Sequence, residues 1–256
     1  MAEDTPLTGS TRAKPFSQAF VRIGSDTGVY EMKRRSIAEV SNRHPRNLQL
    51  VLLSDTHELH REIDDIPAGD IFIHAGDFTM FSRSLRGIVD FNEWLGELPH
   101  QHKIVVPGNH ETFLQTDPEN RSLIGNATVL INQAATVAGL RIWGSPVTPS
   151  GPAFGIRSDE KRERLYCSIP ADTEVLITHG PPFGILDCNP RSTLHQGDRV
   201  LLEAVKRVRP KIHVFGHIHG AYGIMQDEHT TFVNAGLLGR DGDLDKKPIA
   251  LRIAKR

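Results

Sequence analysis

A series of short apolar runs, each followed within two residues by aspartate, asparagine, histidine or glycine, constrains the fold more than any other sequence feature. The runs fall at residues 48–53, 71–73, 104–106, 174–178 and 212–215. They lack the alternation of a strand that faces water on one side, so they are typical of strands covered on both faces. Segments with helical spacing lie between them, and the sequence therefore predicts an α/β fold.

The remaining elements follow from spacing and from turn residues. Helices are predicted at residues 84–98, 159–167 and 200–208. Further strands are predicted at residues 128–131, 140–143, 231–234 and 249–253. The proline- and glycine-rich residues 145–155 form a loop, which either borders a binding site or only connects two strands.

At 256 residues the chain suits one main domain, predicted to span residues 48–256. Residues 1–47 are predicted to be an N-terminal extension that packs on or near it. Within the extension we expect a hairpin from residues 20–23 and 28–32, and a short helix over residues 36–42.

Composition narrows the function classes. The net charge is −1, so no basic excess points to nucleic acid or to an anionic membrane as a partner. The two cysteines, Cys167 and Cys188, form no disulfide framework, and the first residues contain no apolar stretch of the signal-peptide kind. We therefore expect a cytoplasmic protein. Its oligomeric state is left open, with a homodimer as one option.

The polar residues that follow the apolar runs are the candidate functional site. Ligands of open α/β sheets gather at the carboxyl ends of the strands, so these side chains can converge although they are far apart in sequence. Residues two apart on an extended segment face the same way, which suits Asp55 with His57 and His217 with His219. The full set is Asp55, His57, Asp77, Asn109, His110, His179, His217 and His219.

These residue types point to metal chemistry. Aspartate, asparagine and histidine without cysteine are typical ligands of Mn, Fe or Zn at a site that is not purely structural. Seven candidate ligands are too many for one ion and suit two ions that share a carboxylate. With a hydroxide, such a site keeps a net positive charge of about one, which attracts a phosphate ester. A turn or a helix cap explains S-D-T-H, G-D-F or T-H-G equally well when each stands alone. G-N-H-E and G-H-I-H are more specific, and the ordered set is not explained in this way.

The ordered set resembles the calcineurin-like metallophosphoesterase superfamily, whose motifs run D-x-H, G-D, G-N-H, H and G-H-x-H. The sequences of the motifs and their neighbours resemble most those of metallophosphoesterase-domain-containing proteins and class III cyclic-nucleotide phosphodiesterases. It is carried by the segments SDTHELHREI, IHAGDFT, VPGNHE, WGSP, LITHGPP and RPKIHVFGHIHGAYG. The resemblance covers about residues 48–256 and implies a four-layer α/β/β/α sandwich with two mixed sheets. The arginine that protein phosphatases of this superfamily carry soon after G-D is missing, which argues against that branch.

The resemblance also implies a role for each residue. One metal ion would be held by Asp55, His57, Asp77 and His219, and the other by Asp77, Asn109, His179 and His217, with Asp77 as the bridge. His110 would stay off the metals, beside the phosphate, as an acid for the leaving group or a stabiliser of the transition state. Asn109 and His110 would contact the substrate. The ions are expected to be Mn, Fe, Zn or a mixture, with Mn favoured.

The implied activity is hydrolysis of phosphodiesters, cyclic nucleotides among them, by in-line attack of a metal-bridging hydroxide on a small phosphoester. Two alternatives stay open: a phosphomonoesterase or nuclease of the same superfamily, and a catalytically silent scaffold. The scaffold is disfavoured because no ligand position has been lost, His217 included.

The other histidines are weighed separately. His74 and His213 lie inside apolar runs and are predicted to be buried and hydrogen-bonded. His60 and His100 are predicted at the solvated surface. His195 either approaches the phosphate region or does not, and the sequence favours neither.

Overall fold

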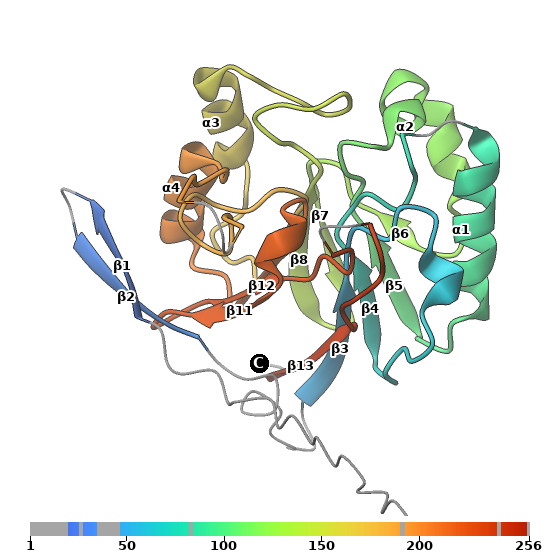
Figure 1. The fold of residues 1–256 in the computed structure, drawn as a ribbon, viewed down its shortest axis with the longest axis horizontal. Coiled ribbons are helices and arrows are strands. Elements are labelled where there is room, and N and C mark those ends of the chain that lie inside the picture. Colours follow the sequence, from blue (N-terminus) through green and yellow to red (C-terminus); the bar gives the residue numbers. More distant parts are fainter. Residues whose placement is uncertain are drawn as a thin grey trace, which may run out of the picture.

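A computed structural model describes residues 20–25, 28–34, 47–81, 84–189, 193–239 and 242–254, with side chains from residue 47 onward. The strands of these residues form two mixed β-sheets, one of five strands and one of eight, with helices on either side (Figure 1). None of the helices in the described ranges has the length and apolar character that a membrane span needs.

The five-stranded sheet has the order β13-β3-β4-β5-β6. Four of its strands run parallel, and β13 pairs antiparallel with β3 at the edge. Because the strands are parallel, the segments that follow β3, β4 and β5 leave the sheet at the same end. The bounds are β3 (Asn47–Leu53), β4 (Ile71–His74), β5 (His102–Val105), β6 (Thr128–Val129) and β13 (Ile249–Ala254).

The eight-stranded sheet has the order β1-β2-β11-β12-β10-β9-β8-β7. Its central strands β12, β10, β9 and β8 are parallel, and the other pairings are antiparallel. The segments after β9 and β10 therefore also leave at one end. The bounds are β1 (Phe20–Ser25), β2 (Gly28–Arg34), β7 (Gln133–Val137), β8 (Leu140–Ser145), β9 (Val175–Thr178), β10 (Ile212–Phe215), β11 (Gly223–Gln226) and β12 (Thr231–Asn234).

The helices cover the outer faces of the sheets. On the outer face of the five-stranded sheet, Phe72 of β4 packs in one apolar cluster with Phe91 and Trp94 of α1. On the outer face of the eight-stranded sheet, Phe215 of β10 packs with Leu201 of α4. Figure 1 shows α1 and α2 on one side of the molecule and α3 and α4 on the other. The helices are α1 (Leu85–Glu97), α2 (Thr112–Thr116), α3 (Asp159–Cys167) and α4 (Arg199–Val208).

A third cluster lies between the two sheets and joins Leu50, Leu52 and Ile73 with Val214 and Val233. Along β3 the neighbours Val51 and Leu53 belong instead to the α1 cluster. The strand thus alternates between two apolar layers, because successive side chains point to opposite faces. This explains the unbroken apolar runs in the sequence and confirms the four-layer arrangement with two mixed sheets.

Most predicted elements are present, with local differences. The strand predicted at residues 128–131 ends at Val129, and β7 and β11 were not predicted. The hairpin is present as β1 and β2, and β2 pairs with β11. The helix predicted at residues 36–42 lies outside the described residues. Short 3-10 helices at His60–Glu62, Pro118–Leu123 and His219–Ala221 were also not predicted.

Candidate metal centre

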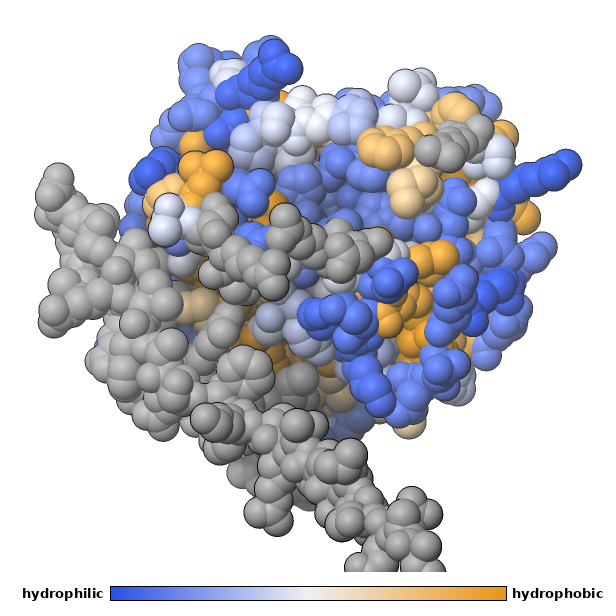
Figure 2. All heavy atoms as spheres, in the orientation of Figure 1, coloured by the Kyte–Doolittle hydropathy of each residue, from blue (hydrophilic) through white to orange (hydrophobic). Residues whose placement is uncertain are grey.

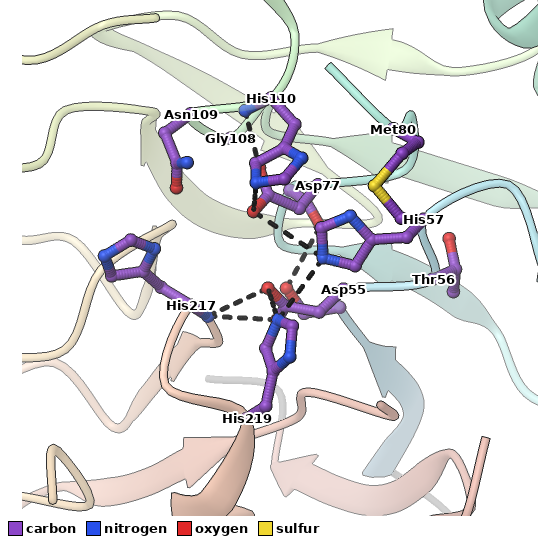
Figure 3. Close-up of polar contacts among 12 residues, drawn as sticks. Asp55, Thr56, His57, Asp77, Met80, Gly108, Asn109, His110, His217 and His219 are labelled. Carbon is purple, nitrogen blue, oxygen red and sulfur yellow. Dashed lines mark hydrogen bonds and ion pairs between the residues drawn. The ribbon is translucent and has the colours of Figure 1, made fainter. Parts of the chain in front are cut away.

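All eight predicted site residues lie in segments that follow five strands of the two sheets. Figure 3 shows side chains from the segments after β3, β4, β5 and β10 gathered round one region, although Asp55 and His217 lie 162 residues apart in sequence. Five of the eight are buried, namely Asp55, His57, Asp77, Asn109 and His179. The strands lead to them in turn: β3 to Asp55 and His57, β4 to Asp77, β5 to Asn109 and His110, β9 to His179, and β10 to His217 and His219.

Asp55, His57 and His219 form the first group of possible ligands, with one ligand atom of each within 4.8 Å of the others. Nε2 of His219 lies 3.3 Å from Nε2 of His57 and 3.4 Å from Oδ1 of Asp55. The carboxylate of Asp55 also accepts the backbone N–H of His217, at 3.1 and 3.0 Å to its two oxygens. Asp55 thus joins the end of β3 to the end of β10.

Asp77, His179 and His217 form a second group under the same 4.8 Å limit. Nδ1 of His179 lies 2.9 Å from the carbonyl oxygen of Ala75 and donates to it, which leaves Nε2 facing the group. Nε2 lies 2.9 Å from Oδ1 of Asn109 and 3.2 Å from Oδ2 of Asp77. One ring nitrogen and two acceptor oxygens therefore converge. A positive charge must hold them together, either a proton on Nε2 or a metal cation, so the donor set fits a cation.

Asp77 lies between the two groups. Its Oδ2 is 3.9 Å from Nε2 of His57 and 3.8 Å from Nε2 of His110, and these three residues form a third possible ligand group. Its Oδ1 accepts the backbone N–H of His110 at 2.9 Å. Asp77 therefore belongs to two of the three possible ligand groups. Distance alone does not separate His110 from the ligands.

The backbone of the site is unusual. Asp55, His57, Asp77 and His217 all have positive φ, between 42° and 67°, which few residues other than glycine adopt. Such conformations persist when surrounding contacts over-determine them, and they concentrate at functional sites. Two glycines permit the close packing: a Cβ at Gly108 would overlap Asp77, and one at Gly216 would overlap the carboxylate of Asp55.

Glu111 ties two of the ligand segments together, and sequence reasoning assigned it no role. It is fully buried, and its Oε2 accepts the backbone N–H groups of Asp77 at 2.9 Å and Gly108 at 2.6 Å. Its Oε1 accepts the N–H and the hydroxyl of Thr79, at 2.9 and 2.8 Å. The segment after β4 is thereby joined to the segment after β5. The only signal in the sequence was an acidic residue directly after Gly108-Asn109-His110.

The mutual charges of the cluster shift its pKa values in both directions. Burial alone would raise the pKa of the Asp55 carboxyl, but His219, His179 and His57 outweigh burial and hold it far below its usual range. Burial disfavours a charged His179, yet Asp77 and Asp55 raise its pKa to about 9. For His217, burial and the nearby His179 lower the pKa to about 4. Because ligating imidazoles must be neutral, a cation bound here would displace the proton of His179.

The rim of the site includes two features outside the predicted set. The ring of Phe81 stacks on the imidazole of His110, with the ring centroids 3.8 Å apart. The loop at residues 145–155 borders the site, since the backbone N–H of Ala153 donates to the carbonyl of Asn109 at 3.1 Å. Nothing in the residue pattern pointed to Phe81.

The other weighed histidines divide into confirmed and wrong predictions. His74 and His213 are fully buried and contact hydroxyls, Thr56 at 3.1 Å and Thr178 at 2.8 Å, as predicted. His60 and His100 are not at the surface. His60 is fully buried against Phe91 and bonds to Asp90 at 2.9 Å, and His100 bonds to the carbonyl of Pro67 at 2.9 Å. Each has an apolar ring face that packs and one nitrogen with a local partner. His195 pairs with Asp187 at 2.7 Å.

Comparison with known proteins gives consistent matches. A family model described as calcineurin-like phosphoesterase matches residues 48–221. Human and mouse proteins named Metallophosphoesterase domain-containing protein 1 are each 40% identical over 220 residues, covering 75% of this chain and 67% of theirs. A UPF0046 protein of Caenorhabditis elegans is 34% identical over 226 residues, covering 82% of this chain and 76% of that protein. One solved structure, 19% identical, has a similar fold with a TM-score of 0.57 over 75% of this chain and 91% of its own.

Proposed function

This chain belongs to the calcineurin-like phosphoesterase family, and on that basis we propose that it hydrolyses phosphodiesters, cyclic nucleotides among them, with two metal ions at the strand ends. The observation that supports this most is the position of Asp77, whose Oδ2 lies 3.9 Å from Nε2 of His57 in the first group and 3.2 Å from Nε2 of His179 in the second. A single buried carboxylate between two sets of imidazoles is the arrangement that two ions sharing one ligand require.

We assign one ion to Asp55, His57, Asp77 and His219, and the other to Asp77, Asn109, His179 and His217. The carboxylates and the amide oxygen suit Mn as well as Fe or Zn, and Mn is our first choice. When bound, such ions polarise a phosphoryl oxygen, activate water near neutral pH and stabilise the charge of the transition state. Nδ1 of His179 is already fixed by the Ala75 carbonyl, so its Nε2 needs no reorientation.

His110 is the residue that we assign to the ester. It is half-buried, and burial lowers the pKa of its imidazole, with Asp77 acting in the opposite direction. A neutral imidazole still donates one N–H hydrogen bond, so His110 can donate to the leaving oxygen or to a non-bridging oxygen as charge develops there. The amide of Asn109 adds no negative charge, which keeps the site attractive to a phosphate ester.

The test uses purified protein reconstituted with Mn. We expect two ions per chain by elemental analysis, and faster turnover of bis-p-nitrophenyl phosphate than of p-nitrophenyl phosphate. Asp77→Ala should lose both metal and hydrolysis, whereas His110→Ala should keep the metal and lower kcat about 10²–10⁴-fold.

The outcomes separate the alternatives. Faster turnover of the monoester would make the protein a phosphomonoesterase. One ion per chain or fewer, with no turnover of either ester, would make it a scaffold. Loss of metal from His110→Ala would show that His110 is a ligand and that our division of roles is wrong.

A further inference from the structure

Exposed large apolar side chains concentrate in one short stretch of the described chain. Among the described residues, four large hydrophobic side chains are exposed, and three of them lie in the stretch from residue 81 to residue 89. They are Phe81 at 47%, Leu85 at 43% and Val89 at 38%. Figure 2 shows that much of the described surface on one face is hydrophilic, with separate hydrophobic patches. Of these three, Phe81 contacts a residue of the metal centre, and an exposed apolar side chain next to a polar site is a candidate for binding.

Phe81 is the member that reaches the site. Its ring lies nearly parallel to the imidazole of His110, at an interplanar angle of 22° and a centroid distance of 3.8 Å. The His110 side chain is only 15% exposed, while Phe81 is 47% exposed. The stack therefore presents mainly the phenyl ring to solvent, directly beside the group that faces the ester.

The backbone holds this ring in place. Phe81 has a φ of 59°, a left-handed conformation that disfavours a residue with a side chain. The preceding Met80 donates its N–H to Oε1 of Glu58 at 3.2 Å, and the hydroxyl of Thr112 donates to the Phe81 carbonyl at 3.4 Å. Contacts from both sides thus fix a strained residue whose apolar ring remains in water. Burial in a hydrophobic core does not explain that arrangement.

We propose that Phe81 is a specificity-determining residue that binds an aromatic group of the substrate, so that the preferred phosphoesters carry an aryl group, or a nucleobase, that can reach Phe81 from the ester. The inference rests on the proposed function, which places the ester beside His110. An aromatic group stacked on an exposed ring typically changes affinity about twofold to tenfold. Leu85 is the first residue of α1 and Val89 lies about one turn further along it, and neither has a ring to stack.

The experiment measures binding of phenylphosphonate and methylphosphonate to the Mn-loaded protein by calorimetry. We expect the wild type to bind phenylphosphonate about threefold to tenfold more tightly. Phe81→Ala should reduce this ratio to about one, and Phe81→Tyr should keep it. Leu85→Ala is the matched control, because Leu85 is about as exposed as Phe81, and it should leave the ratio unchanged. Phe81→Leu, which keeps apolar bulk without an aromatic ring, replaces the alanine variant if that variant does not fold.

Two results would overturn the inference. One is a wild type without preference for the phenyl ligand. The other is a Phe81→Ala variant that weakens both ligands equally, since Phe81 would then only position His110. Turnover of phosphoesters by the wild type is measured separately, so a failure of the proposed function is seen there and not in the ratio of the two ligands.

Discussion

Replacing Glu111 with glutamine tests whether the site is held by the contact between its two ligand segments. The carboxylate accepts three backbone N–H groups and one hydroxyl, all buried. A glutamine can keep its oxygen toward Asp77 and Gly108 and turn its NH₂ toward the Thr79 hydroxyl, which can accept. The N–H of Thr79 is then left without an acceptor.

The expected destabilisation follows from that count. One buried donor without a partner costs about 1–3 kcal/mol, so Glu111→Gln should lower the free energy of unfolding by about 2 kcal/mol. Glu111→Ala strands three N–H groups and should cost roughly 3–6 kcal/mol. Burial and Asp77 raise the pKa of Glu111 to about 7, so the comparison belongs at pH 8, where the wild-type carboxylate is mostly ionised. Because Asp77 and Asn109 would be less firmly placed, Mn affinity should fall about 10–100-fold in Glu111→Gln.

The assays are urea unfolding of the metal-free protein and calorimetric titration with Mn. Glu174→Gln is the matched control: Glu174 is 3% exposed, accepts the N–H of Arg141 at 3.3 Å and pairs with Lys211 at 3.0 Å. It precedes β9, at the opposite end of that strand from His179. This variant should lose stability but keep Mn affinity. If both variants lose stability and neither loses affinity, Glu111 does not position the ligands.

Two further substitutions probe the core and the close packing. Burial lowers the pKa of His213 to about 3, so below pH 6.5 the unfolded chain binds a proton that the folded chain does not, and stability falls as pH falls. Compared with His213→Gln, the metal-free wild type should therefore lose about 2 kcal/mol of its free energy of unfolding between pH 7.5 and pH 5, as measured by urea unfolding. A difference in unfolding free energy between the two proteins that does not change with pH would refute this. Gly216→Ala should lower the free energy of unfolding by about 1–3 kcal/mol and weaken Mn binding, because the new Cβ would overlap Asp55. Gly125→Ala is the control: a Cβ at Gly125 meets nothing within 4 Å, so this variant should keep both its stability and its Mn affinity.

The sequence predicted the elements whose pattern reflects burial. The run from Leu48 to Leu53 is apolar because β3 contacts the other sheet on one face and α1 on the other, and that cause is visible in the residues themselves. By contrast, β7 is composed of Gln133, two alanines, Thr136 and Val137 and is largely exposed at the sheet edge, so no apolar pattern marks it. Its existence depends on pairing with β8, a tertiary contact that composition does not encode.

The residues of the candidate site also fall into those that could be predicted from the sequence and those that could not. The identity of the ligands could be predicted because each of their motifs follows a strand, and parallel strands bring those ends together. The support around them could not. Glu111 and Phe81 act through contacts across gaps of about 30 residues, with Thr79 and Asp77 in one case and His110 in the other. Such contacts depend on the conformation of the loops, and the presence of a glutamate or a phenylalanine in the sequence does not reveal that conformation.

The left-handed backbone at Asp55, His57, Asp77 and His217 shows how the fold and the chemistry depend on each other. A residue other than glycine in this conformation is disfavoured by about 1–3 kcal/mol, so four of them are a substantial load on a domain of ordinary stability. The hydrogen bonds of Asp55 to His217 and of Asp77 to His110 oppose that load, and they run between the carboxylates that we assign to metal and the strand ends that carry the imidazoles. A bound cation would join the same segments directly, by coordinating carboxylates and imidazoles from different strand ends. Metal binding and folding stability should therefore be coupled at this site more tightly than at one built on relaxed backbone.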